Sequence, residues 1–204
     1  MDDLHKALGD INSIRRQMAR STEFRGYGPA TLAATGFLAI SAAGAQAIWL
    51  PDPANHIPSY LGIWISTAIV SAALMSVQMV TRSHRIHSGM ADAMIRMAVE
   101  QFLPSAAAGA LLTLVLLRSA PSALWMLPGL WQIIFSLGVF SSCRFLPRPI
   151  AAAGVWYLLT GLGCIALADS RALSPLTMGI SFGAGQLLVA GILFFTAQEG
   201  SDES

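Results

Sequence analysis

The sequence contains little charge. Asp, Glu, Lys and Arg make up 11% of its 204 residues and hydrophobic residues 54%, whereas a typical soluble domain carries about 25% charged residues. So few charges cannot cover a water-facing surface, and most of the chain is therefore expected to lie in lipid. The net charge of +1 gives no electrostatic basis for binding nucleic acid or an acidic substrate.

Ionisable side chains are missing from the centres of the apolar stretches. Proton-coupled carriers and ion pumps usually keep such a residue, and retinal proteins need a lysine, so these classes are disfavoured. No spaced carboxylate pair, metal cluster or activated nucleophile is evident, and we expect neither an enzyme nor a cofactor. The two cysteines, Cys143 and Cys164, are expected at different depths of neighbouring helices and therefore as free thiols.

Six apolar stretches run through the chain, and each is about as long as the roughly 20 residues that cross a bilayer. Backbone groups in lipid must be hydrogen-bonded internally, so these stretches predict helices. The predicted fold is an all-α bundle of six transmembrane helices in a single domain, 1–204. An N-terminal segment, 1–28, precedes the bundle, 29–197, and an acidic tail, 198–204, follows it. The apolar runs of the helices are expected at 29–50, 60–80, 100–118, 123–143, 150–168 and 174–197. The third helix is expected to begin before its apolar run, within 90–100. The three prolines of 51–59 are expected to exclude a helix there.

Lys and Arg are distributed unevenly between the two sides of this bundle. Ten lie on one side and two, Arg118 and Arg171, on the other. The positive-inside rule assigns the first side, with both termini, to the cytoplasm. Four aromatic residues are expected in a belt at the opposite interface. The ten cations are Lys6, Arg15, Arg16, Arg20, Arg25, Arg82, Arg85, Arg96, Arg144 and Arg148, and the four aromatic residues are Trp49, Tyr60, Trp64 and Trp125.

Residues 2–21 are predicted to form an amphipathic helix. Leu4, Leu8, Ile11 and Met18 follow a spacing of three to four residues, with a gap at Arg15, which places them on one helical face. Such a helix either lies on anionic lipid headgroups or docks a cytoplasmic partner or a second copy of the chain.

The connection 81–99 is the second candidate docking segment, with Arg85 and Arg96 as its docking cations. His84 and His87 also make it a weak candidate for a metal site. No cysteine and no H-E-x-x-H pattern accompanies these histidines. A solvated basic face and a pH-responsive element are the alternatives.

Glutamines are the main polar residues within the predicted helices. Gln132 and Gln186, together with Trp131, are candidates for lining a ligand cavity. The alternative is that these amides form hydrogen bonds between helices, each contributing about 0.6–2 kcal/mol. Gly179 and Gly183 form a GxxxG pair, which allows close helix packing either within the chain or between copies in a homo-oligomer.

Two short patterns occur once in each half of the chain. Leu-Pro-x-Pro occupies 50–53 and 146–149, after the first and fourth predicted helices. Gly-Ile-Trp at 62–64 and Gly-Val-Trp at 154–156 lie early in the second and fifth. The patterns suggest a three-plus-three duplication, whose halves would have opposite topology because each contains an odd number of spans. Such inverted repeats are common in transporters.

Three segments resemble an uncharacterised family of bacterial six-helix inner-membrane proteins: 4–20, 127–131 (Leu-Pro-Gly-Leu-Trp) and 179–191. Members of that family often have a histidine where this chain has Gln186. The resemblance implies a six-helix fold and a partnership with small winged-helix regulators, because such regulators are sometimes encoded nearby. It implies no established activity.

Two functions are therefore predicted from the sequence. The first is a sensor or accessory protein with a cytoplasmic docking face for a regulatory partner. The second is a small carrier or channel for a neutral or lipid-like solute, based on the possible inverted repeat and the glutamine-containing interior.

Overall fold

The computed structural model describes residues 28–86, 91–143 and 148–202, and within these ranges the chain is helical and contains no strand. The expected amphipathic helix and its four apolar residues lie outside the described residues. The α-helices are α2 (Pro29–Trp49), α3 (Ile57–Ile86), α4 (Ala91–Ser119), α5 (Leu127–Ser142), α6 (Ala151–Ala166) and α7 (Pro175–Asp202), with the short 3-10 helices η1 (Pro121–Met126), η2 (Arg148–Ile150) and η3 (Ser170–Leu173) between them. The all-α prediction is confirmed.

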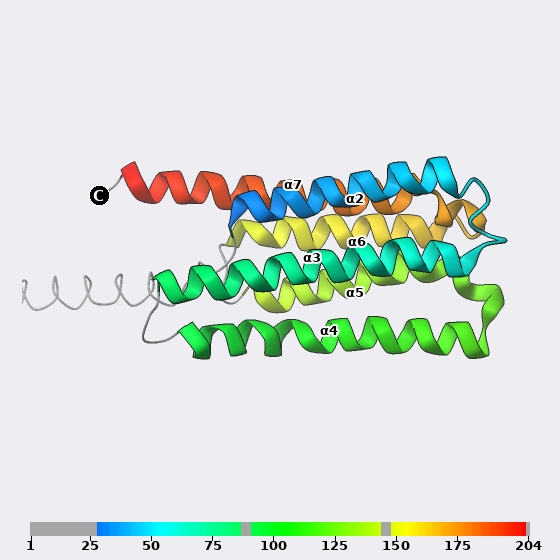
Figure 1. Cartoon of the computed structure of the whole chain (residues 1–204), viewed down its shortest axis with the longest axis horizontal. Coiled ribbons are helices and arrows are strands. Elements are labelled where there is room, and N and C mark those ends of the chain that lie inside the picture. Colours follow the sequence, from blue (N-terminus) through cyan, green and yellow to red (C-terminus); the bar gives the residue numbers. More distant parts are fainter. Residues whose placement is uncertain (1–27, 87–90, 144–147, 203–204) are drawn as a thin grey trace, which may run out of the picture.

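The helices run up and down beside one another (Figure 1). Each packs against its neighbours in sequence, and α2 also packs against α7. The connections 50–56, 120–126 and 167–174 lie together at one end of the bundle, which we call the loop end. Gly28 and the last residues of α7 lie at the opposite end, which we call the terminal end.

Five helical segments are long and apolar enough to cross a membrane, namely Pro29–Trp49, Ile57–Thr81, Val99–Ser119, Pro121–Ser142 and Pro175–Thr196. The remaining predicted span, 150–168, corresponds to α6, which has only 16 residues. At 1.5 Å per residue α6 measures about 24 Å, shorter than the bilayer core of about 30 Å.

Two helix boundaries differ from those predicted. α3 begins at Ile57, before the predicted start, because Pro58 lies in its first turn, where no backbone donor is needed. The fourth predicted helix is divided into η1 and α5. Pro128, at the start of α5, has no amide hydrogen to continue an α-helix from the preceding turn. The early start of the third helix, at Ala91, is as predicted.

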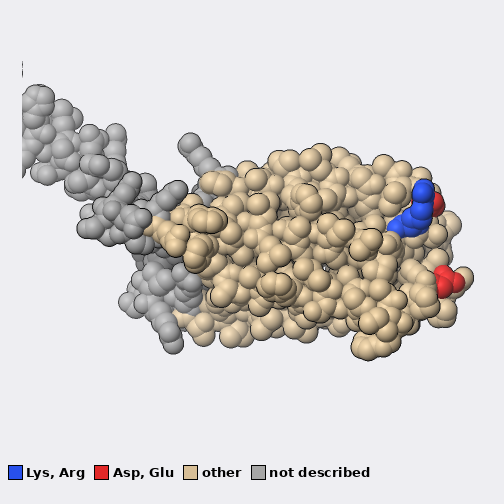
Figure 2. Space-filling view, turned by 90° about the horizontal axis from the view of Figure 1, so that it is seen from above, with Lys and Arg blue, Asp and Glu red and all other residues tan. Residues whose placement is uncertain are grey.

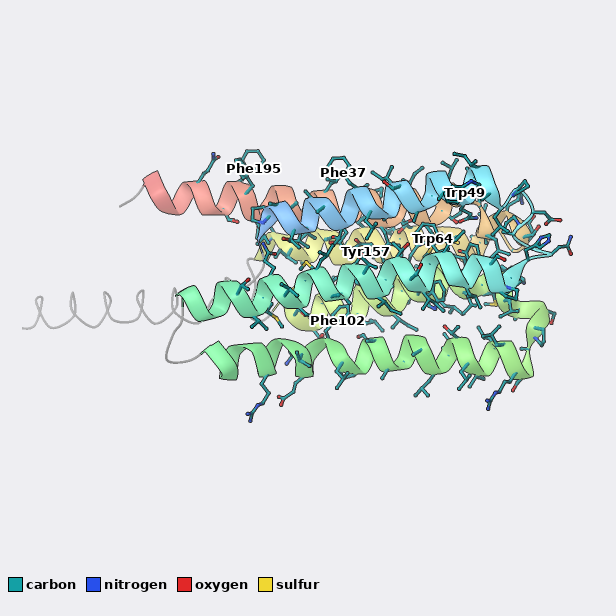
Figure 3. The ribbon with its side chains drawn as sticks, viewed as in Figure 1. Phe37, Trp49, Trp64, Phe102, Tyr157 and Phe195 are labelled. Atoms are coloured by element: carbon teal, nitrogen blue, oxygen red, sulfur yellow. The ribbon has the colours of Figure 1, made fainter. Side chains whose placement is uncertain are left out.

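Apolar side chains cover the outside of the bundle. On the face drawn in Figure 2, the coloured charged residues lie only at the loop end. Phe37 and Phe195 point away from the bundle, whereas Trp64 and Tyr157 lie between helices (Figure 3). Only 6% of the residues in the apolar part of Val99–Ser119, in α4, are buried, compared with 44% in Pro121–Ser142, which contains α5. The α4 helix is therefore peripheral, and α5 is central.

Glycines set the closest helix contacts. A Cβ on Gly179 would lie 2.5 Å from the Ala43 Cβ of α2, and Gly183 faces α2 in the same way. The GxxxG pair therefore packs within the chain. Between α5 and α6, a Cβ on Gly129 would lie 2.6 Å from the Gly161 carbonyl oxygen. At both crossings the helices approach more closely than any larger residue would allow.

The two tryptophans of the possible repeat bond differently. The Trp64 indole N–H donates to Gln46, on the preceding helix α2, at 2.7 Å. The Trp156 indole N–H instead donates to the Ser181 carbonyl oxygen, on the following helix α7, at 2.9 Å. In a duplicated structure, the two hydrogen-bond acceptors would lie on corresponding helices of the two halves. The inverted repeat therefore stays a prediction without support from these contacts.

Candidate functional site

Gln46 joins three elements at the loop end. Its side chain is fully buried. Nε2 donates to the Leu173 carbonyl oxygen of η3 at 2.7 Å, and Oε1 accepts the Trp64 indole N–H of α3 at 2.7 Å. Both polar atoms of the amide are thus bonded, as a buried amide requires. Gln46 therefore ties α2 to α3 and to the connection between α6 and α7.

The connection between α6 and α7 is tied to the other helices by a second group of contacts. Thr177 Oγ1 donates to the Ala172 carbonyl oxygen at 2.7 Å, and Cys164 Sγ lies 3.7 Å from the same oxygen. Gln132 Nε2, on α5, donates to the Thr177 carbonyl oxygen at 3.1 Å. These contacts and those of Gln46 form one buried polar region, the loop-end cluster. Its members are Gln46, Trp64, Gln132, Cys164, Ala172, Leu173 and Thr177.

Three buried oxygens have no hydrogen-bond partner in the described part of the chain: the Tyr60 hydroxyl, Gln132 Oε1 and the Tyr157 hydroxyl. The Tyr157 ring packs against Phe135 and Phe182, with ring centroids 4.8 and 5.3 Å apart. The Tyr157 ring is therefore in aromatic surroundings and its hydroxyl lies against Gly185, whereas Gln132 Oε1 belongs to the loop-end cluster.

The three predicted ligand-binding residues do not meet in one place. Gln132 faces α6 and α7, whereas the Trp131 indole N–H donates to Thr113 Oγ1 of α4 at 2.8 Å. Gln186 faces α2, where its Cβ would lie 3.2 Å from a Cβ on Gly36. Along α7, Gln186 lies about 13 Å from Thr177, to which Gln132 bonds. Ligand binding by these residues stays a prediction, but a shared site for all three is not formed.

The loop-end surface carries exposed charges. Arg171 Nε lies 3.0 and 2.8 Å from the two Asp169 carboxylate oxygens, an exposed ion pair that contributes about 0–1 kcal/mol. In the connection before α3, the side-chain hydrogen bond from Asn55 holds the pKa of Asp52 below its usual range. In the described residues no three His, Cys, Asp or Glu side chains are grouped as metal ligands.

The terminal end contains three helical projections. α3, α4 and α7 extend past the ends of α2, α5 and α6 (Figure 1). Beyond the apolar segments, the projections consist of 82–86, 91–98 and 197–202, or about 8, 12 and 9 Å of helix. Arg96 is exposed on the second projection. Arg85 and His84 lie on the first, but their side chains, like His87 as a whole, lie outside what the structure describes.

The described chain enters the bundle beside the first projection. The Gly28 amide donates to Gln78 Oε1 of α3 at 3.1 Å. Gln78 lies one turn before residue 82, where this projection starts. The N-terminal segment and α3 are therefore joined at the terminal end.

The aromatic belt was predicted wrongly for two of its residues. Trp49 is 77% exposed, but Tyr60 and Trp64 are buried in the core of the bundle. The belt rule uses only the depth of a residue in the membrane, whereas α3 turns these two side chains into the core of the bundle. Sequence reasoning missed Gln46 and Trp64 as a pair. The only sign of this pair in the sequence was that Gln46 and Trp64 can both form hydrogen bonds and lie near the facing ends of two adjacent predicted helices.

No family model, curated protein or solved structure matches this chain. The function therefore has to be argued from the cluster at the loop end and the projections at the terminal end.

Proposed function

We propose that this chain is a membrane-embedded accessory or regulatory protein whose terminal end is a docking face for a cytoplasmic partner. The observation that carries the proposal is the extension of α3, α4 and α7 beyond the apolar segments of the bundle. The bilayer core accounts for about 20 residues of a helix, so these additional turns lie in the headgroup region or in water. The charged residues on these turns, Arg85 and Arg96 among them, are suited to binding a partner at the membrane surface.

The charges at this end agree with docking. Arg82, Arg85 and Arg96 lie on the first two projections, whereas Arg118 and Arg171 lie at the loop end. The positive-inside rule therefore favours a cytoplasmic terminal end, and the resemblance to bacterial inner-membrane proteins is our reason to propose that membrane. The Gly28–Gln78 hydrogen bond holds the last residue of the N-terminal segment at the same end. We therefore include its predicted amphipathic helix in the docking face.

The polar groups of the interior favour an accessory role over transport. The indole N–H groups of Trp64, Trp131 and Trp156, and both polar atoms of Gln46, bond to other protein groups. Groups held in this way join helices and are not free to bind a solute along a path. A carrier or channel for a neutral or lipid-like solute stays the alternative, favoured by the unpaired buried oxygens of Tyr60 and Gln132.

Site-specific photo-crosslinking tests the docking face. A photoreactive residue replaces Arg96, which is exposed on the α4 projection, or Leu111, which is 63% exposed in the apolar part of the same helix. We expect irradiation of native membranes to give one dominant protein adduct from position 96 and only lipid adducts from position 111. Identification of the adduct by mass spectrometry names the partner.

Deletion of residues 1–21 completes the experiment. The shortened chain is expected to insert in the membrane but to lose the protein adduct at position 96. Lipid adducts alone at both positions, in the full-length chain, would contradict the docking proposal. An adduct that survives the deletion would remove the N-terminal segment from the docking face and leave the α4 projection in it.

A further inference from the structure

A proline interrupts α4 near the terminal end of its apolar segment. Pro104 lies inside the helix, and it has no amide hydrogen to give to the Glu100 carbonyl oxygen four residues earlier. Sharp bends of long helices occur mostly at such positions. Pro104 divides α4 into an N-terminal part, 91–103, which we call the α4 arm, and the rest of the helix. The arm carries Arg96, the exposed residue of the proposed docking face.

The two parts of α4 are attached to α5 by separate hydrogen bonds. In the part after the proline, Thr113 Oγ1 accepts the Trp131 indole N–H at 2.8 Å. In the arm, the Gln101 carbonyl oxygen accepts the Ser141 hydroxyl at 3.2 Å. Each side of Pro104 therefore has its own attachment to α5, and the proline lies between the two.

Phe102 holds the arm in a notch of α5. Its side chain points from α4 towards α5 (Figure 3), where the ring packs edge-on against Phe135 with the ring centroids 5.3 Å apart. A Cβ on Gly138 would lie 2.6 Å from the Phe102 ring, so the ring occupies space that only a glycine leaves open. The described side chains of the arm other than Gln101 and Phe102 are exposed. The Phe102 ring and the bond from Ser141 therefore form a small latch between the arm and α5.

The latch can open at small energetic cost. The Ser141 hydroxyl oxygen also lies 3.0 Å from the Gly138 carbonyl oxygen of its own helix. Since a hydroxyl has one proton to donate, the bond to Gln101 can be exchanged for the bond to Gly138 without leaving the donor unpaired. Lipid tails are as apolar as the contacts that the Phe102 ring would leave. The apolar part of α4 is little buried, so movement of the arm disrupts little other packing.

We propose that the α4 arm pivots on Pro104 between a closed and an open position. In the closed position Phe102 fills the Gly138 notch, and in the open position its ring lies in lipid while Ser141 bonds only within α5. A swing of about 20° would move Arg96 by about 4 Å, because this residue lies about 12 Å along the helix from the proline. The effect of the pivot on docking rests on the proposed function, whereas the pivot itself requires no partner.

Fluorine NMR of the purified full-length chain in lipid nanodiscs tests the pivot. Para-fluorophenylalanine replaces Phe102 or, in a separate sample, Phe37, which is 60% exposed and gives the reference signal of a ring in lipid. We expect the signal from position 102 to report both positions of the ring, as two resonances or as one exchange-averaged resonance. Ser141→Ala should raise the ratio of open to closed about threefold, the effect of losing one hydrogen bond between membrane helices. Pro104→Ala restores an amide hydrogen to the helix and should lower this ratio.

Ser142→Ala is the matched control. The Ser142 hydroxyl donates to the Gly138 carbonyl oxygen of its own helix at 2.9 Å, so its removal should leave the signal from position 102 unchanged. The pivot requires a response to both other variants. If Ser141→Ala or Pro104→Ala leaves the ratio unchanged, or if Ser142→Ala shifts it as far as Ser141→Ala does, the proposal fails. Photo-crosslinking at position 96 tests docking alone, so its failure would not alter this result.

Discussion

Gly161→Ala is expected to destabilise the bundle by about 3 kcal/mol, at the upper end of the usual cost of overpacking. A Cβ at this position of α6 would lie 2.8 Å from the Gly129 carbonyl oxygen and 3.0 Å from Gln132 Cβ. Backbone atoms cannot rotate away as the end of a flexible side chain can, so α5 and α6 must separate. Their separation also strains the Gln132 bond to Thr177. Thermal unfolding in lipid nanodiscs should show a fall in Tm of roughly 6–12 °C.

Gly163→Ala is the matched control in the same helix. A Cβ on Gly163 meets nothing within 4 Å, so the substitution should leave Tm unchanged or raise it slightly through better helix propensity. The contrast repeats in α7, where Gly183 is tightly packed and Gly191 is open. Similar losses of Tm from Gly161→Ala and Gly163→Ala would show that the helix crossing does not depend on the missing side chain.

The sequence predicted the helices well because their cause is local. Lipid excludes unbonded backbone groups, so a long apolar run must be helical wherever it lies in the fold. The apolar runs therefore predicted both ends of α2 and the start of α7 to within one residue, whereas α7 continues to Asp202, past the predicted end at 197. Departures occurred where proline position mattered, since Pro58 is accepted in a first turn whereas Pro128 separates η1 from α5.

The polar contacts were harder to predict because they depend on how each helix is rotated about its axis. Gln132 and Trp131 are adjacent in sequence, but a rotation of about 100° between successive helical residues turns one towards α7 and the other towards α4. No apolar stripe in the sequence reveals that rotation, because lipid and core are both apolar. The same uncertainty hid the burial of Tyr60 and Trp64.

The proposed docking face could be predicted from the sequence only in part, for a different reason. Cations were predicted in the connection 81–99, and the helical projections at 82–86 and 91–98 give Arg85 and Arg96 a defined position on helices. The identity of a partner depends on surface shape and on residues of the partner itself. Neither follows from the sequence of one chain, which is why the crosslinking experiment is designed to identify the partner directly.

Gln46→Leu is expected to destabilise the protein by about 2–4 kcal/mol, because it leaves two buried groups unsatisfied. The Trp64 indole N–H loses its acceptor, and the Leu173 carbonyl oxygen loses its donor. Leucine has a similar size, so the change tests the hydrogen bonds and not the packing. The measurement is the free energy of unfolding of the variant in bicelles. The control is Gln186→Leu in α7, because Gln186 is half-buried and its side chain forms no hydrogen bond within the described part of the chain. This variant should lose less than about 1 kcal/mol of its free energy of unfolding.

The double variant Gln46→Leu, Trp64→Phe separates the two causes of that loss. Removing the indole N–H together with its acceptor leaves no buried donor unpaired, and replacing both partners of a hydrogen bond by apolar groups is often nearly neutral. The double variant should therefore lose less stability than the sum of the two single variants, by about 1–2 kcal/mol. The remaining loss belongs to the Leu173 carbonyl oxygen and to the smaller ring. Strict additivity would mean that Gln46 and Trp64 do not act as a pair, and that the end of α2 is held to α3 by packing alone.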